Sequence, residues 1–350
     1  MRKDRRTVWR ETAKHERNMR IFREELDGFL PGKILDFHVH VWPEGVLPKG
    51  EVFSCAGHPI TKYDFDDLVR DLGETYPGRE TAAVCFGLPD ISYDREANNR
   101  YVAGGCNRKR FFAFRLFDPN EADRKAVRKS IIDGAFMGLK PYHNYVRKAD
   151  PGEVEITQML PSWIMEIAKE LRLVIMLHIP RRGRLADPVN QEQIVRLCRE
   201  YPDVAIVLAH IGRAYFLRNI AGNLERLKDL PNLYFDLAML NNTEVLEYLF
   251  RTVDAGKILY ATDIPIALAP GKSVEINDQY TYVTPLPWHL SISDDHGKLV
   301  FTSFLYEELR AIRKAAERTG LSGHALEGIF CENGMRLLRE RLSRPTGRGT

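Results

Sequence analysis

Eight short runs of apolar residues recur along the chain, each rich in β-branched and aromatic side chains and bounded by turn residues. This pattern is typical of strands, and near-continuous apolar runs are typical of strands that are buried on both faces of a parallel sheet. The predicted strands occupy residues 33–40, 81–89, 110–119, 135–143, 173–180, 204–212, 233–240 and 258–266.

Amphipathic helical patterns separate these runs. The stretch 161–171 begins with Pro161, which suits the first turn of a helix, and its apolar residues recur at helical spacing. Residues 214–230 repeat the pattern and predict a second such helix. Strands that alternate with amphipathic helices predict an α/β fold, and eight units predict a (β/α)8 TIM barrel. The alternative, a doubly wound open sheet, is disfavoured because no GxGxxG or Walker A loop follows any strand.

Polar residues recur where the predicted strands end. In a (β/α)8 barrel the active site lies at the carboxyl ends of the strands, so side chains from different strands meet there. The residues at that end are His38 and His40 in the first strand, Lys140 and His143 in the fourth, His178 in the fifth, His210 in the sixth and Asp263 in the eighth.

The first strand ends in the sequence ILDFHVH at residues 34–40. Side chains alternate between the two faces of a strand, so His38 and His40 point to the same side. One histidine at a strand end is most often a hydrogen-bonded core residue. Two in register favour a metal site, because imidazole is the commonest ligand for zinc and related transition metals.

The barrel is expected to span residues 31–345, preceded by an extension at 1–30 that is helical near its end. Two long segments, 41–63 and 267–300, are rich in Gly, Pro and aromatic residues. They follow the first and eighth strands, where lid loops are expected.

The composition narrows the class of protein. The 350 residues carry 51 basic and 48 acidic side chains, a net charge of +3, which gives no sign of general nucleic-acid binding. Five cysteines form no CxxC pair and fit a reducing compartment. No stretch approaches the run of about 18 apolar residues that a membrane span needs. We therefore expect a cytoplasmic protein with neither nucleic-acid nor membrane partners.

Five motifs in order carry a family resemblance. They are DFHVH at 36–40, LH at 177–178, AHIGR at 209–213, ATDIP at 261–265 and IFCENGMRLL at 329–338. The chain resembles the amidohydrolase-2 family of the amidohydrolase superfamily, which also contains aminocarboxymuconate semialdehyde and resorcylate decarboxylases. The resemblance covers roughly residues 30–340.

The resemblance implies a metal centre. His38, His40, His178 and Asp263 match the family's ligands for one divalent cation, usually zinc, with manganese or another transition metal as the alternative. His210 matches a histidine near the metal-bound water. A cation with an open coordination position makes hydroxide available at neutral pH. Asp263 would then act as general acid and base, and His210 would polarise the substrate carbonyl or hold the developing charge.

Each of these residues also has a simpler interpretation. Asp263 could cap a helix and His210 could cap a turn. Cys55 and His58, in the segment after the first strand, are interpreted as ordinary loop residues rather than ligands. Arg115 is interpreted as a paired residue at the barrel rim.

Basic residues near the expected site favour an anionic substrate. Arg213 is the first candidate for binding a carboxylate, and Lys140 and Arg181 are further candidates. In two-metal members of the superfamily a lysine of the fourth strand is carboxylated and bridges the ions. We expect instead one metal ion and a free Lys140 amine.

The function expected from these features is metal-dependent hydrolysis of a small carboxylated molecule, a lactone, ester or amide. A nonoxidative decarboxylase would use the same ligands and is the alternative. A catalytically inactive barrel is the third interpretation, and it is disfavoured because buried polar groups are costly to retain without a use. A homodimer is left open.

Overall fold

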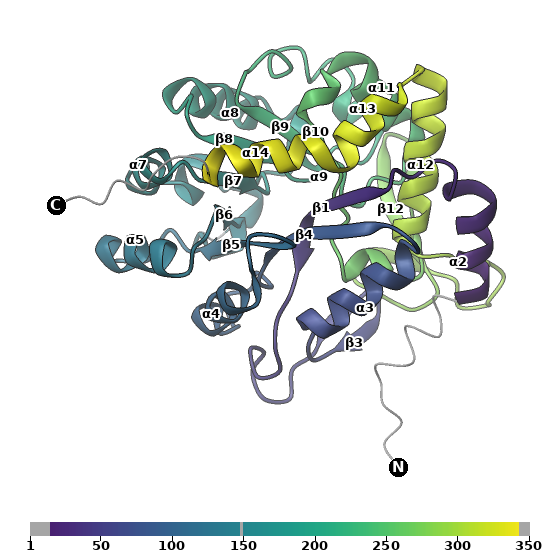
Figure 1. The fold of residues 1–350 in the computed structure, drawn as a ribbon, viewed down its shortest axis with the longest axis horizontal. Helices are drawn as coiled ribbons and strands as arrows, with labels where there is room; N and C mark the ends of the chain where they lie inside the picture. Colours follow the sequence, from purple (N-terminus) through teal and green to yellow (C-terminus); the bar gives the residue numbers. More distant parts are fainter. Residues whose placement is uncertain (1–14, 148–149, 343–350) are drawn as a thin grey trace.

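Eight parallel strands form the centre of the computed structural model, which describes residues 15–147 and 150–342 (Figure 1). Their order in the sheet follows their order in the chain, and the prediction of a (β/α)8 barrel is confirmed. The strands are β1 (Lys33–His40), β4 (Glu80–Phe86), β5 (Phe111–Phe117), β6 (Gly138–Pro141), β7 (Val174–Leu177), β8 (Ala205–Leu208), β9 (Leu233–Asp236) and β10 (Ile258–Leu259).

The barrel closes between β1 and the chain that follows β10. The backbone N–H of Phe37 donates to the carbonyl of Tyr260 at 2.9 Å, and the N–H of Asp263 donates to the carbonyl of His38 at 2.9 Å. Closure therefore places Asp263 directly beside the histidines of the first strand.

The eighth strand is shorter than the prediction of 258–266, because the chain leaves strand geometry soon after Leu259. The N–H of Thr262 donates to the side-chain carboxylate of Asp36 at 3.0 Å rather than to a backbone carbonyl of the neighbouring strand. Asp263 has a φ of +71°, in the left-handed region. This irregular end turns the Asp263 side chain toward the barrel mouth.

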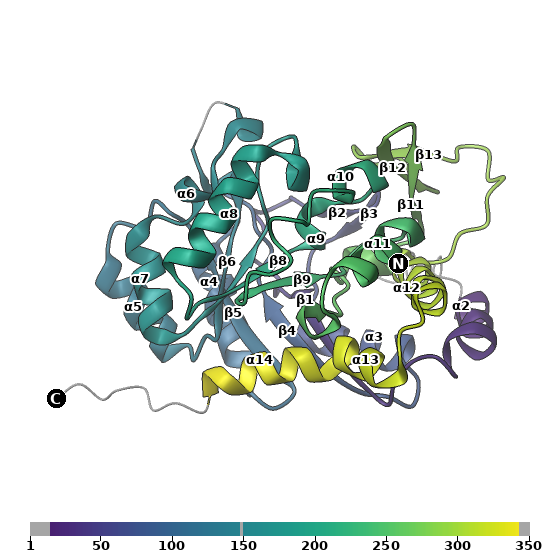
Figure 2. The same cartoon turned by 90° about the horizontal axis from the view of Figure 1, so that it is seen from above.

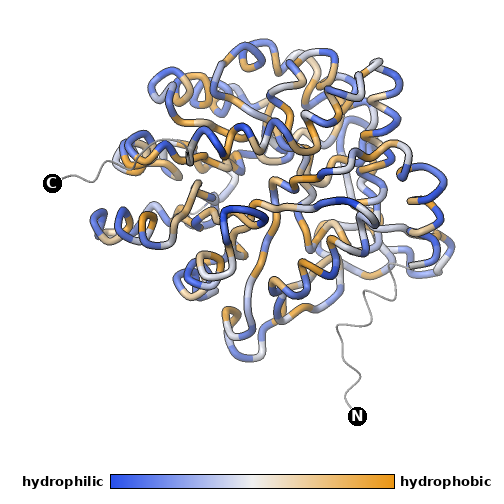
Figure 3. The backbone as a smooth tube through the Cα atoms, in the orientation of Figure 1, coloured by the Kyte–Doolittle hydropathy of each residue, from blue (hydrophilic) through white to orange (hydrophobic). Residues whose placement is uncertain are grey.

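Helices pack around the barrel, and hydrophilic and hydrophobic residues are interspersed along each of them (Figure 3). The one expected at 161–171 is confirmed as α7. The outer helices are α3 (Phe65–Thr75), α4 (Arg95–Gly105), α5 (Arg124–Asp133), α7 (Ser162–Leu171), α8 (Pro188–Glu200), α10 (Leu217–Ile220), α11 (Thr243–Thr252) and α12 (Phe304–Thr319).

The helix expected at 214–230 is wrong over most of its length. Only α10 (Leu217–Ile220) forms, and the chain turns at Gly222, whose φ is +74°. Leu224 and Leu227 are nevertheless fully buried. Their apolar spacing reflects burial of an irregular segment, which sequence periodicity cannot distinguish from a helix.

The amino ends of the strands are covered by the last part of the chain (Figure 2). The elements there are α13 (Gly323–Glu327), a π-helical turn at Gly328–Glu332 and α14 (Asn333–Leu342). The Asn333 side chain donates to the carbonyls of Ala255 and Ile258 at 2.8 and 2.9 Å. This end of the barrel is therefore plugged, which leaves the opposite end for the site.

Two small sheets stand at the opposite end of the barrel (Figure 2). The segment 41–63 contains the hairpin of β2 (Phe53–Cys55) and β3 (His58–Ile60), and 267–300 contains β11 (Lys272–Ile276), β12 (Gln279–Thr284) and β13 (Ser291–Ser293). A Cβ added at Gly57 would lie 2.7 Å from the Cβ of Leu286. The two segments are thus in close contact, and their lid role stays a prediction.

The N-terminal extension is helical from His15 to Leu26. Residues 1–14 lie outside the described part, and the chain then forms α2 (His15–Ile21) and a π-helical turn at Phe22–Leu26. Phe22 and Leu26 are buried against the rest of the protein. The division at residue 30 stays a prediction. In residues 15–147 and 150–342, no helix has the length and apolar character needed to cross a membrane.

Short helical turns complete the description. They are α6 (Ile156–Met159), α9 (His210–Arg213) and 3-10 turns at His143–Tyr145, Pro151–Glu153, Arg184–Ala186, Ala255–Lys257 and Ile266–Leu268.

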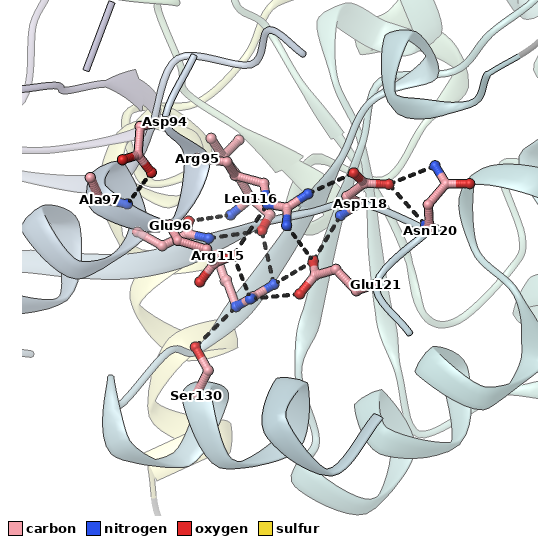
Figure 4. A network of polar contacts seen from close by, with 11 residues as sticks. Asp94, Arg95, Glu96, Ala97, Arg115, Leu116, Asp118, Asn120, Glu121 and Ser130 are labelled. Atoms are coloured by element: carbon pink, nitrogen blue, oxygen red, sulfur yellow. Dashed lines mark hydrogen bonds and ion pairs between the residues drawn. The ribbon is translucent and has the colours of Figure 1, made fainter. Parts of the chain in front are cut away.

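Arg115, in β5, is the centre of a polar network on the outside of the barrel (Figure 4). Its guanidinium makes two parallel hydrogen bonds to the carboxylate of Glu121, at 2.9 and 2.8 Å, and one to Glu96 at 2.9 Å. The side chain is only 2% exposed. Arg115 therefore ties the start of α4 to the loop after β5, as expected for a paired rim residue.

Candidate active site

The residues expected to carry chemistry gather at the open end of the barrel, and most are buried. They come from five strand ends: His38 and His40 on β1, Lys140 on β6, His178 after β7, His210 after β8 and Asp263 after β10. Asp236, at the end of β9, joins them without having been expected.

The two histidines of β1 are held through their Nδ1 atoms. His38 Nδ1 lies 2.9 Å from a carboxylate oxygen of Asp236, and His40 Nδ1 lies 2.8 Å from the carbonyl of Gly87. Both partners are acceptors, so each imidazole carries its proton on Nδ1. The Nε2 atoms are left unprotonated, which is the form that binds a metal ion.

His210 is held in the same way. Its Nδ1 lies 3.0 Å from the carbonyl of Ala238, and its backbone N–H donates to Asp236 at 2.6 Å. Burial is the largest cause that lowers the pKa of His210, to about 4. The imidazole is therefore neutral at pH 7, with its lone pair on Nε2.

Three lone pairs converge on the Asp263 carboxylate. The Nε2 atoms of His40 and His38 lie 3.1 and 3.5 Å from Asp263 Oδ1. The Nε2 of His210 lies 3.9 Å from Oδ2. These contacts have the distances of ion pairs, but unprotonated Nε2 atoms donate no hydrogen bond, and Oδ1 has no hydrogen-bond partner. Lone pairs facing a carboxylate repel one another unless a cation lies between them.

The donor set therefore fits a divalent metal ion. One ligand atom from each of His38, His210 and Asp263 lies within 4.8 Å of the others, and all three residues are buried. Imidazole nitrogens with a carboxylate oxygen are the ligands that zinc and its neighbours prefer.

His178 stands at the edge of this group. Its ring centre lies 5.5 Å from that of His210, and its Nδ1 is buried without a hydrogen-bond partner. The ring stacks on Tyr142 at 4.5 Å and lies 5.5 Å from His143. Its expected role as a ligand stays a prediction. By contrast, Nε2 of His210 lies 3.9 Å from Oδ2 of Asp263, close enough for both atoms to contact one ion.

A left-handed turn, α9, positions His210 and Arg213. All four of its residues have positive φ, between +51° and +65°. Such backbone is unfavourable for residues other than glycine by roughly 1–2 kcal/mol each, and it is concentrated at functional sites. At Gly212 a Cβ would lie 2.9 Å from Cδ1 of Leu185, so any larger residue there would displace that side chain.

Lys140 lies beneath the histidines. It is fully buried, and its Nζ is 3.2 Å from His38 Nε2. Burial lowers the pKa of Lys140 to about 8, while the charges of Asp236 and Asp263 act in the opposite direction.

The two candidate arginines differ in what they contact. Arg181 pairs with Asp187 at 2.9 Å and Glu153 at 3.3 Å, so its guanidinium is largely engaged. Arg213 donates one hydrogen bond, to the carbonyl of Ile179 at 3.2 Å. In the described part of the chain no carboxylate forms an ion pair with Arg213. Substrate binding by either arginine stays a prediction. Of the two, Arg213 has more guanidinium N–H groups that no described residue uses.

Asp236 is the site residue that the sequence analysis did not single out. It is fully buried, and its carboxylate holds both His38 and His210. Burial raises the pKa of Asp236 to about 7, and the Lys140 charge is the largest opposing effect. The available signal was a carboxylate inside the otherwise apolar run LYFD.

A family model described as amidohydrolase matches residues 35–339. The chain belongs to the amidohydrolase family. This confirms the resemblance drawn from the motifs, and membership supports an enzymatic role. No curated protein sequence gives a significant match.

Solved structures share the fold of this chain. An amidohydrolase from Burkholderia multivorans with bound zinc is 13% identical, with a TM-score of 0.58 over 87% of this chain and 99% of that one. Amidohydrolase 2 from Bifidobacterium longum subsp. infantis is 15% identical, with a TM-score of 0.53 over 88% and 99%. The 2,6-dihydroxybenzoate decarboxylase from Rhizobium is 16% identical, with a TM-score of 0.51 over 89% and 99%.

Proposed function

We propose that the protein is a metal-dependent hydrolase that acts on a small carboxylated molecule, a lactone, ester or amide. The observation that carries the proposal is the convergence of three Nε2 lone pairs on the Asp263 carboxylate. His38, His40, His178 and Asp263 would hold one divalent ion. Zinc is the first candidate, since the similar structure from Burkholderia multivorans contains it. A bound ion would supply an acidified water and polarise the scissile carbonyl.

Asp263 is proposed as the general acid and base. Its side chain is 13% exposed, so one face of the carboxylate reaches the barrel mouth. It takes a proton from the attacking water and delivers that proton to the leaving oxygen or nitrogen. A carboxylate within reach of both groups can serve both steps.

His210 takes a role narrower than the one expected from the sequence. Because its Nδ1–H is bonded to the Ala238 carbonyl, Nε2 is an acceptor and cannot donate to a substrate carbonyl. We therefore assign it to accepting a hydrogen bond from the attacking water, which fixes the direction of attack.

Arg213 is proposed to bind the substrate carboxylate. Among the described residues, only the Ile179 carbonyl accepts a hydrogen bond from the Arg213 guanidinium. Its charge is the second cause, after burial, of the lowered pKa values of His143 and His178. A guanidinium close to these rings could hold a carboxylate through charge-assisted hydrogen bonds beside the site.

A second candidate function is nonoxidative decarboxylation of an aromatic acid. The observation that favours it is a group of near-parallel rings, Tyr142, His143 and His178, with interplanar angles of 18–27°. Aromatic faces stack well on planar substrates. In this reaction the bond to the carboxylate breaks, its electron pair stays on the ring carbon, and Asp263 delivers a proton there.

A substrate panel distinguishes the two functions. Zinc-loaded protein is incubated with carboxylated lactones, esters, amides and aromatic acids. One assay follows hydrolysis of the lactone, ester or amide bond, and a second follows release of carbon dioxide. Hydrolysis without carbon dioxide supports the first function, and carbon dioxide from an aromatic acid supports the second. Activity must be lost in Asp263→Asn and kept in Asp278→Asn, whose carboxylate pairs with Arg218 on the surface. Turnover that survives Asp263→Asn would contradict the proposed mechanism.

A further inference from the structure

Lys140 is a buried cation whose hydrogen bond is made to a proposed metal ligand. Its side chain has no exposed surface, and its Nζ lies 3.2 Å from Nε2 of His38. The ammonium also lies over the ring of Phe86, 4.8 Å from its centre, and 5.6 Å from that of Tyr142. Within the described residues it forms no ion pair. Its position is thus set by His38 and two aromatic faces.

The contact with His38 uses the atom that a metal ion would need. Asp236 fixes the proton of His38 on Nδ1, so Nε2 has a single lone pair in the plane of the ring. That lone pair can accept a hydrogen bond from an ammonium or bind a cation, and it cannot do both at once. The two positive charges would also repel each other at this distance, because the surroundings are buried.

We propose that Lys140 is an internal competitor of the metal ion. Without metal, its ammonium holds the His38 lone pair and partly neutralises the charges of the two nearby carboxylates, Asp236 and Asp263. When the ion binds, the ammonium leaves His38 Nε2 and becomes available to an anionic substrate. The inference rests on the proposed metal site and adds a role for Lys140 in setting how tightly that site holds its ion.

The test compares zinc affinity in two lysine variants. Lys140→Met keeps the length and apolar character of the side chain and removes the charge. Lys129→Met removes the same charge from the surface of α5, where the side chain is 76% exposed. Zinc dissociation constants are measured at one pH by competition with a chromophoric chelator. Lys140→Met should bind zinc about tenfold tighter or more, and Lys129→Met should match the wild type.

Each other outcome has a defined meaning. Unchanged affinity in Lys140→Met, with zinc bound by the wild type, overturns the inference alone. Weaker affinity also overturns it, because the lysine would then help to hold the ion, as a carboxylated lysine does. Zinc binding by Lys140→Met but not by the wild type supports complete competition. Absence of zinc from both proteins contradicts the proposed metal site together with the inference.

A second measurement uses the wild type and does not depend on how the variant folds. Crystal structures are determined with and without zinc. The inference expects Lys140 Nζ within hydrogen-bond distance of His38 Nε2 only in the zinc-free form. An ammonium that stays on His38 Nε2 while zinc is bound to that residue would overturn it.

Discussion

Replacement of Asp236 by asparagine should damage the metal site without removing any metal ligand. The carboxylate accepts hydrogen bonds from three donors, at 2.9 Å from His38 Nδ1, 2.6 Å from the His210 N–H and 3.3 Å from the Ala238 N–H. An amide has one acceptor oxygen and one donor nitrogen. In either orientation, the amide N–H that Asp236→Asn introduces points at another donor, either His38 Nδ1–H or the backbone N–H of His210.

The size of the loss in zinc affinity and in unfolding free energy depends on which hydrogen bond of residue 236 is lost. If the amide nitrogen faces His38, the imidazole must move its proton to Nε2 and lose the lone pair used for metal binding. If it faces the His210 N–H, a buried backbone donor is left without a partner, which costs about 1–3 kcal/mol of unfolding free energy. Loss of such a partner of a metal-binding histidine typically weakens metal affinity by about 10–100-fold. We expect both effects, with the affinity change dominant.

The assay measures zinc dissociation constants by chelator competition and the unfolding free energy of the metal-free protein in urea. Asp278→Asn makes the same chemical change on the surface, where its carboxylate is 58% exposed, and should leave both quantities unchanged. Zinc affinity in Asp236→Asn equal to that of the wild type would refute the argument that this carboxylate fixes the tautomer of His38.

Four further outcomes are expected. Asp263→Asn should abolish turnover while circular dichroism shows an intact fold, because an amide cannot shuttle a proton. Arg213→Met should raise KM for a carboxylated substrate more than for an uncharged analogue, and equal effects would exclude carboxylate recognition. Arg115→Met should cost about 2–4 kcal/mol in urea unfolding, because Glu121 loses its two buried hydrogen bonds. The pKa of His143, lowered by burial to about 4, means that the folded state binds fewer protons than the unfolded state below pH 6.5. Metal-free protein should therefore lose stability as the pH falls from 6.5 toward 4, and His143→Phe should reduce that slope.

Much of the fold follows from apolar runs in the sequence. The predicted first strand has the bounds observed for β1, and each other predicted strand overlaps a barrel strand. The predicted carboxyl ends are too long, because residues such as Thr262 and Asp263 bond to side chains or adopt left-handed backbone. Apolar spacing also predicts a false helix at 214–230, since burial of Leu224 and Leu227 needs no helix.

Of the candidate site, the sequence predicts the residues but not their partners. His38 and His40 follow from strand alternation, whereas the acceptors on their Nδ1 atoms lie elsewhere in the chain, in Asp236 on β9 and in Gly87 just after β4. Asp236 contacts His38 across 198 positions of chain, a pairing that no local pattern encodes. Likewise, the engagement of Arg181 with Asp187 depends on how the loop after β7 folds.

The proposed metal site is tested most directly by locating the bound ion. Crystals of the protein loaded with zinc are measured on both sides of the zinc absorption edge, so that the anomalous signal locates each ion. We predict one ion per chain, bound by His38, His40, His178 and a carboxylate oxygen of Asp263, with an unmodified Lys140. No ion between these residues, or a second ion bridged by a carboxylated Lys140, would contradict it.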